Sequence, residues 1–234
     1  MNQEFNNPTP VVPVFSLGAE ARGTFIAKTY AHLFGAILFF TGLEFLYFQT
    51  DIAGSILNVI SGTSWLLVLG AFVLVSWFAS RAAFTARSYS AQYLALAGFV
   101  VAESIIFVPM LAYAQMVAKG GVIESAALTT LIGFAGLTFI AFGTRKDFSF
   151  LRGILMWVGL SAIIGIIASL VFGFELGTWF SVAMVAFAGA SILYDTSNII
   201  HHYPQDRYVG AALQLFAAVA MMFWYLLRMF SSRN

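Results

Sequence analysis

The chain contains no cysteine and very little charge. Of its 234 residues, 9% are Asp, Glu, Lys or Arg, whereas soluble domains carry about a quarter. Without cysteine there is no disulfide, no thiolate nucleophile and no cysteine-based metal site. The net charge of +1 comes without a clustered basic face, so nucleic acid is not an expected partner. With so few charges most of the surface cannot face water, and the sequence therefore predicts an integral membrane protein.

The sequence consists largely of long apolar runs. Hydrophobic residues make up 61% of the chain, and their runs approach or exceed the roughly 18 to 20 residues needed to cross about 30 Å of hydrocarbon. Continuous apolarity favours helices, because the strands of a membrane barrel alternate between apolar and polar residues. The predicted fold class is all-α, a polytopic membrane protein with seven transmembrane helices at approximately 24–47, 64–84, 91–117, 123–143, 153–172, 177–200 and 208–230.

The chain is predicted to consist of a tail, residues 1–23, and one transmembrane domain, residues 24–234. The tail has three prolines, three asparagines and no helical period, so we expect it to be disordered. The longest connection, residues 49–64, is semi-apolar and is expected to lie along the membrane interface.

Lysine and arginine predict the orientation, because cytoplasmic loops carry an excess of both. A cytoplasmic N-terminus puts eight of them inside and three outside. With seven helices the C-terminus then lies outside, and the end of the sixth helix lies at the cytoplasmic interface. The eight are Arg22, Lys28, Arg81, Arg87, Arg145, Lys146, Arg152 and Arg207, and the three are Lys119, Arg228 and Arg233.

Three carboxylates fall at membrane depth: Glu44 late in the first helix, Glu103 in the middle of the third, and Asp195 near the end of the sixth. An unpaired charge costs about 2.5 to 3.5 kcal/mol at the bilayer centre, so all three should face the protein interior. Asp195 has two interpretations. It serves as a functional group in a polar cavity, or it holds helix ends together by pairing with an arginine such as Arg81 or Arg207.

Polar residues around Asp195 favour the cavity. Ser191, Asp195, Asn198 and His202 follow spacings of four, three and four, which place them on one helix face within about 60°. Such a stripe could line a water-filled path. His201 and His202 are the candidate pH sensors, because imidazole titrates near physiological pH.

The sequence lacks the motifs that characterise several classes of enzyme. The sequence contains no HExxH, no Walker A loop and no GxSxG motif. An intramembrane aspartyl protease needs a second membrane aspartate, but Asp51, Asp147 and Asp206 fall in predicted loops. We therefore expect no enzymatic activity.

Two stretches carry a resemblance to a known family. "GTRKDFSFLRGIL", residues 143–155, and "LYDTSNIIHHY", residues 193–203, together resemble the Bax inhibitor-1 family and its bacterial YccA-like branch. The resemblance implies a seven-helix bundle with the last helix at its centre. In some members it also implies a pH-sensitive calcium leak controlled by two aspartates, and Asp195 matches the first of them.

The second aspartate is absent, because Ala218 stands at the position where it is expected. Glu103 is the best candidate for a replacement, and Arg81 could correspond to an arginine that latches the channel-like members. The YccA-like branch instead implies an inner-membrane modulator of a membrane-anchored ATP-dependent protease. Both functions stay open: the protease modulator, and a calcium leak with Asp195 at the cytoplasmic gate.

No cofactor is expected beyond calcium. Calcium takes about six to eight oxygen ligands, and one carboxylate with Ser191, Asn198 and backbone carbonyls would make only a weak site at Asp195. The expected partners are the lipid bilayer and a membrane-bound protease.

Overall fold

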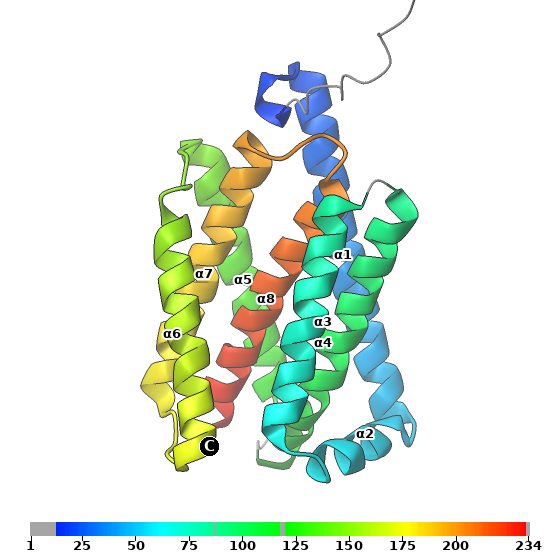
Figure 1. Cartoon of the computed structure of the whole chain (residues 1–234), viewed down its shortest axis with the longest axis vertical. Helices are drawn as coiled ribbons and strands as arrows, with labels where there is room; N and C mark the ends of the chain where they lie inside the picture. Colours follow the sequence, from blue (N-terminus) through cyan, green and yellow to red (C-terminus); the bar gives the residue numbers. More distant parts are fainter. Residues whose placement is uncertain (1–12, 87, 118–119, 233–234) are drawn as a thin grey trace, which may run out of the picture.

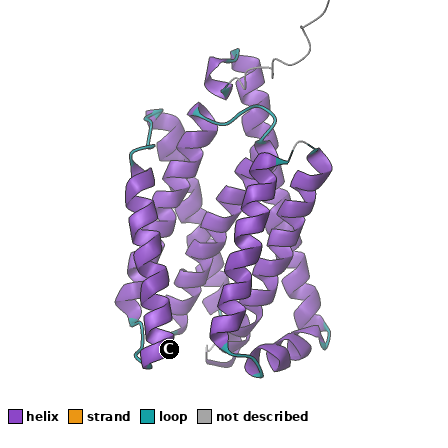
Figure 2. Ribbon diagram, viewed as in Figure 1, coloured by secondary structure: helices purple, strands orange, loops and turns teal. Residues whose placement is uncertain are grey.

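The computed structural model describes residues 13–86, 88–117 and 120–232, which form an elongated helical bundle (Figure 1). Within these ranges the structure contains helices and loops without a β-strand (Figure 2). The elements are the 3-10 helix η1 (Val14–Ser16) and the α-helices α1 (Ala19–Gln49), α2 (Ile52–Ser61), α3 (Trp65–Thr85), α4 (Tyr89–Val117), α5 (Val122–Thr144), α6 (Leu151–Phe172), α7 (Thr178–His201) and α8 (Tyr208–Ser231).

Seven of the described helices are long and apolar enough to cross a membrane, which confirms the predicted all-α polytopic fold. Their ends lie within two residues of the predicted ones, except that α1 begins at Ala19 and not near residue 24. Residues 19–23 are too polar to be recognised as part of a membrane span. Glu20 lies in the first turn of α1, where a negative charge is favourable next to the helix dipole.

The last helix, α8, runs through the middle of the bundle (Figure 1) and packs against α1, α3, α4, α5 and α7. Residues all around its circumference are buried, including Leu213, Leu215 and Leu227. At Gly210 a Cβ atom would lie 3.0 Å from the carbonyl oxygen of Ala83, so α8 touches the backbone of α3 there. Small residues permit this close approach in lipid. The structure thus has the central last helix that the resemblance implies.

Two helices lie outside this core. In α6, at the edge of the bundle, only Ala162 is buried among the residues of the helix. The short helix α2 occupies the predicted connection and lies across one end of the bundle (Figure 1). It is anchored by Ala53, which packs with Tyr47 of α1 and Val108 of α4.

We name the two ends of the bundle after landmarks. The Tyr203 end carries residues 13–18, 145–150 and 202–207, and the α2 end carries α2 and the end of α8. Seven of the eight predicted cytoplasmic Lys and Arg residues are described, and all belong to elements at or near the Tyr203 end, whereas Arg228 is at the α2 end. Arg87, Lys119 and Arg233 lie outside the described residues. Which end faces the cytoplasm stays a prediction.

The predicted disordered tail ends earlier than residue 23. Pro13 forms an isolated β-bridge with Pro204, and the N–H of Val14 donates to the carbonyl of Tyr203 at 2.9 Å. The side chain of Val14 is fully buried. Residues 13–23 are thus part of the folded domain. The sequence does not predict this, because Val14 packs against residues distant in the chain and shows no hydrophobic periodicity of its own. Residues 1–12 lie outside the described residues.

Candidate functional site

The loop between α5 and α6 docks on the end of α7. The N–H of Phe148 donates to Oγ of Ser197 at 2.9 Å, and the Ser197 hydroxyl donates to the carbonyl of Lys146 at 3.4 Å. The Nε2 atom of His202 lies 3.2 Å from Oδ2 of Asp147. The two stretches that carry the family resemblance, far apart in sequence, are therefore one structural unit, which we call the docked loop: residues 145–150 with Ser197 and His202.

The two predicted pH sensors have different surroundings. His202 and Asp147 are 47% and 46% exposed, so their ion pair is solvated and contributes less than about 1 kcal/mol. The pKa of Asp147 is lowered, chiefly because the N–H of Ser149 donates to its Oδ1 at 2.8 Å and to a smaller extent because of the nearby histidines. His201 contacts the Ser197 carbonyl at 2.9 Å through Nδ1. Both histidines thus belong to the docked loop or its edge.

Asp195 is buried, with 8% of its surface exposed, below the end of α7. It makes no hydrogen bond or ion pair with any residue that the structure describes. Its electrostatic neighbours are Tyr30 of α1 and Tyr203. The hydroxyl of Tyr30 lies next to those of Thr138 and Thr196, and all three are buried without a hydrogen bond of normal geometry. We call these three side chains the hydroxyl cluster.

Tyr203 lies close enough to Asp195 to interact with it electrostatically. Its side chain is buried, and its ring stacks on Phe84 with a centroid distance of 5.6 Å and lies 6.4 Å from the ring of Phe25. The pKa of Tyr203 is raised well above its ordinary value, first because the phenol is buried and second because the negative charge of Asp195 opposes ionisation. The electrostatic neighbour of Asp195 at this end is therefore a buried aromatic residue packed against two phenylalanine rings.

The predicted polar stripe continues only part of the way. The Ser191 hydroxyl donates to a carbonyl of its own helix at 3.0 Å. The carbonyl of Asn198 accepts the N–H groups of His202 and Tyr203 at 2.8 and 3.0 Å, and α7 ends at this point. Asp195 thus shares a helical face with Ser191 and Asn198, whereas His202 lies beyond the helix.

The other predicted site residues do not meet Asp195. Arg81 is exposed, with its guanidinium 5.6 Å from a tryptophan ring of its own helix, and Arg207 makes its ion pair with an adjacent aspartate. Glu103 is buried in the middle of α4, with no ion pair or hydrogen bond to Asp195. Ala218 is buried in α8. Among the described residues Asp195 therefore has neither the cationic partner nor the second carboxylate that we considered.

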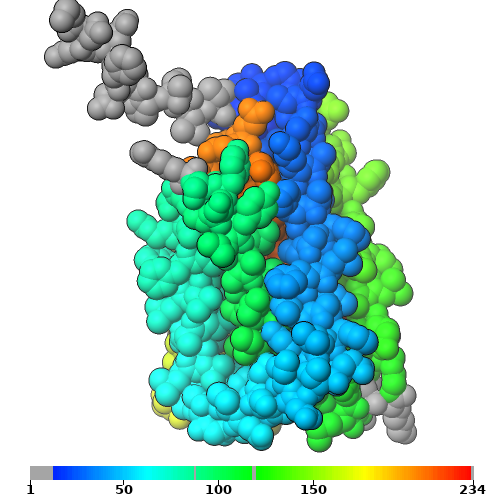
Figure 3. Space-filling view, turned by 90° about the vertical axis from the view of Figure 1, so that its right-hand side faces the viewer, coloured from blue at the N-terminus to red at the C-terminus, as the bar shows by residue number. Residues whose placement is uncertain are grey.

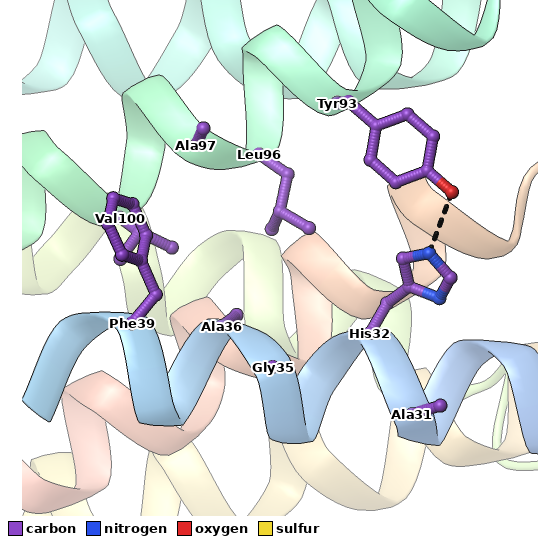
Figure 4. Close-up of a pocket in the computed structure, with 9 residues that line it drawn as sticks. All are labelled: Ala31, His32, Gly35, Ala36, Phe39, Tyr93, Leu96, Ala97 and Val100. Carbon is purple, nitrogen blue, oxygen red and sulfur yellow. Dashed lines mark hydrogen bonds between the residues drawn. The ribbon is translucent and has the colours of Figure 1, made fainter. Parts of the chain in front are cut away.

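A cavity of about 370 Å³ lies between α1 and α4, away from Asp195. Figure 4 shows His32 and Tyr93 at one end of it, with Nε2 of His32 2.8 Å from the Tyr93 hydroxyl, and small or apolar side chains along the rest. The His32 ring also lies 5.1 Å from that of Tyr208, and Nζ of Lys28 lies 5.3 Å from the same ring. His32 thus joins α1 to α4 and α8.

Sequence reasoning missed the surroundings of Asp195. The sequence could have indicated Tyr203, because this aromatic residue ends the polar stretch that follows Asp195. Nothing in the sequence indicates Tyr30 or Thr138 as neighbours of Asp195, since they belong to other helices and each lies in an ordinary apolar run. Only the packing of α1 and α5 against α7 brings their hydroxyls to this site.

Comparison with known families agrees with this architecture. The model of the family described as "Inhibitor of apoptosis-promoting Bax1" matches residues 22–234. The chain belongs to the Bax inhibitor-1 family. The match includes every transmembrane helix, with only the start of α1 outside it.

Relatives in this family come from both eukaryotes and bacteria. Bax inhibitor 1 of Schizosaccharomyces pombe is 32% identical over 221 residues, which are 91% of this chain and 77% of the relative. The modulator of FtsH protease YccA of Escherichia coli is 32% identical over 118 residues, 49% of this chain and 53% of the relative. An uncharacterized protein of Pseudomonas aeruginosa is 37% identical over 115 residues, 47% of this chain and 50% of the relative. The chain thus spans about half the length of these two bacterial relatives.

Proposed function

We propose that this protein modulates a membrane-anchored ATP-dependent protease of the bacterial inner membrane, with the Tyr203 end in the cytoplasm. Support comes from the name of its relative YccA, a modulator of FtsH protease. The excess of Lys and Arg at the Tyr203 end favours the orientation. The protein acts by binding and not by catalysis.

The observation that carries the proposal is the way the chain is fastened at residues 13 and 14. An ATP-dependent protease engages a client through a terminal segment, and residues 1–12, fully extended, reach at most about 40 Å. The next residues are bridged to Pro204, hydrogen-bonded to Tyr203 and buried at Val14. A protease that pulls on residues 1–12 must therefore break the Tyr203 end before it can unfold the bundle. Such a protein occupies the protease without being degraded quickly.

The docked loop supplies a second contact surface at the same end. Arg145 and Lys146 are exposed, and hydrogen bonds to Ser197 fix the backbone beside them. A fixed basic surface next to the terminal segment can recognise an acidic face of the protease, because complementary charge raises association rates and selects partners.

The test measures the half-life of a model substrate of the membrane protease in cells with and without this protein, together with co-purification of the two proteins. Deleting residues 2–12 should abolish association and leave the thermal unfolding midpoint unchanged. A substrate half-life that ignores the presence of the protein, or full association after this deletion, would refute the proposal.

A second function, the pH-sensitive calcium leak, is favoured by the hydroxyl cluster. Buried polar groups without well-formed hydrogen bonds are costly, and the three hydroxyls, with Asp195 near Tyr30, could hydrate or coordinate a passing cation. The single carboxylate argues for weak binding, since calcium takes about six to eight oxygens. Flux through liposomes from pH 5 to 8 decides this: flux that rises with acid and changes in Asp195→Asn establishes the leak, whereas an Asp195-independent background favours the modulator.

A further inference from the structure

A second cavity, of about 260 Å³, lies between α1, α4, α5 and α8 and contains Glu44 in its wall. Glu44 belongs to the last turns of α1, close to the α2 end, and only 8% of its surface is exposed. Both of its carboxylate oxygens are buried, and neither has a hydrogen-bond partner among the residues that the structure describes. A buried carboxylate in this state is costly, because it has lost water and gained no donor.

The wall of this cavity offers Glu44 no donor. Its two hydroxyls belong to Thr41 and Thr130, which donate to carbonyls of their own helices at 2.8 and 2.7 Å. All other lining residues are apolar. The lining therefore supplies no hydrogen-bond donor to Glu44, and such a donor is available only from a molecule that enters the cavity.

Three aromatic rings define what kind of donor fits. Phe40, Phe216 and Phe223 line the same cavity as Glu44. Phe107 holds two of them in place, since its ring lies edge-on to Phe40 at 5.0 Å and is stacked on Phe223 at 5.5 Å. Aromatic faces attract cations, most strongly where water is excluded. A carboxylate among phenylalanine rings is thus complementary to an ammonium group that carries an apolar substituent.

The entrance and the size limit the ligand further. Thr41 of α1 and Leu131 of α5 line the cavity and are exposed, so it opens between these two helices. Figure 3 shows the face of the bundle on which α1 lies between α4 and α5, a face that lipid covers in a membrane. The volume is below the ~300 to 1,000 Å³ of pockets for drug-sized molecules, and the ligand must first partition into the bilayer.

We propose that this cavity is a binding site for a lipophilic amine smaller than a drug-sized molecule. Its ammonium group donates to the carboxylate of Glu44, and its apolar part lies among Phe40, Phe216 and Phe223. The site is independent of protease modulation and lies near the opposite end of the bundle from the docked loop.

The experiment compares phenylbutylamine, which is protonated at pH 7, with phenylbutanol, a neutral molecule of the same length. Binding to the full-length protein in lipid nanodiscs is measured by equilibrium dialysis, and binding to empty nanodiscs is subtracted. The wild-type protein should bind the amine at least tenfold more tightly than the alcohol. Glu44→Gln, which keeps the shape of the side chain and removes the charge, should abolish this preference.

The control variant is Glu124→Gln, which removes an exposed carboxylate from the first turn of α5 and should keep the preference. Ala127→Phe, which fills the cavity from α5, should lose both ligands. Equal affinity of the wild type for amine and alcohol would overturn the proposal, and so would a preference that survives Glu44→Gln. If Glu44→Gln does not fold, the wild-type preference and its loss in Ala127→Phe decide the question.

Discussion

At the Tyr203 end, segments from different parts of the chain are joined by directional hydrogen bonds, whereas at the α2 end the contacts are mainly apolar. The first end has the bonds of Val14 to Tyr203, of Phe148 to Ser197, and of Arg207 to the carbonyl of Ala86. At the second end, Arg228 donates to the carbonyl of Leu176 at 2.6 Å, and α2 is held by the packing of a few apolar side chains. Directional bonds fix a surface in one shape, which suits recognition of a protein.

The carboxylates follow the same division. Asp195, towards the Tyr203 end, has the hydroxyl-bearing residues Tyr30 and Tyr203 near it, while Glu44, towards the α2 end, lines an apolar cavity. A buried acid surrounded by hydroxyls can be solvated by the protein, but one in an apolar cavity cannot. The two proposals rest on this difference: contact with a protease at the Tyr203 end and binding of an amine near the α2 end. Four predictions test how firmly the Tyr203 end is held together.

The largest effect is expected at the close contact of α8 with α3. Gly210→Leu places a Cβ atom 3.0 Å from the carbonyl oxygen of Ala83, and the rest of the side chain must displace its neighbours. Overpacking of this kind costs about 3 kcal/mol, so the thermal unfolding midpoint in detergent should fall by many degrees. Gly98→Leu is the matched control, since a Cβ atom at Gly98 meets no atom within 4 Å. An equal midpoint for both variants would show that α8 is not closely packed there.

The second prediction concerns the anchor at Val14. Val14→Ala removes most of a fully buried side chain, and complete burial of such a side chain is worth about 1.5 to 3 kcal/mol. Deleting residues 2–17 should lower the unfolding midpoint at least as much, whereas deleting residues 2–12 should leave it unchanged. Unfolding curves of the two truncated proteins measure this directly. Identical curves would mean that residues 13–17 are not anchored to the bundle.

The anchor also shows where sequence reasoning reaches its limit. Apolar length predicts the seven spans to within two residues at nearly every end, because lipid requires a minimum length and internal hydrogen bonding whatever the neighbours are. Val14 and Ala19–Gly23 were placed in the tail because no period marks them. Their order depends on Tyr203 and Pro204, which are distant in sequence.

For the candidate site, the sequence predicts the central residue but not its neighbours. The polarity of Asp195 at membrane depth was sufficient to single it out. Of the two interpretations of Asp195, pairing with an arginine has no support among the described residues, since Arg81 is exposed and Arg207 makes its ion pair with an adjacent aspartate. Tyr30 and Tyr203 lie near Asp195 instead. Tyr203 ends a polar stretch and was open to notice, whereas Tyr30 lies in an apolar run that does not indicate where its hydroxyl points.

The third prediction tests the docked loop. Ser197→Ala leaves the N–H of Phe148 without its acceptor, a loss of about 1 kcal/mol. The loop should open more often, so trypsin should cleave after Arg145 or Lys146 faster than in the wild type. Ser149→Ala is the control in the same loop, because it also removes one hydroxyl but keeps the backbone N–H that donates to Asp147 and does not touch the bond between Phe148 and Ser197. Equal cleavage rates for the two variants would show that Ser197 does not hold the loop.

The smallest effect is expected for the carboxylate of Asp147. Its pKa is depressed in the folded protein, so its contribution to stability is complete above the unfolded pKa and is lost as the pH falls through the folded pKa. Asp147→Asn should therefore lower the unfolding midpoint slightly at pH 7, by the equivalent of less than about 1 kcal/mol for an exposed pair. The difference from the wild type should shrink at pH 3.

Comparison with His202→Gln separates the two partners of Asp147. The main cause of the depressed pKa is the Ser149 N–H and not the histidine. His202→Gln should consequently keep most of the pH dependence that Asp147→Asn removes, since the bond from Ser149 to Oδ1 stays in place. Thermal unfolding of the three proteins between pH 3 and 7 measures both effects. If His202→Gln removes as much of the pH dependence as Asp147→Asn, the ion pair, and not the turn within the loop, is what joins this loop to α7.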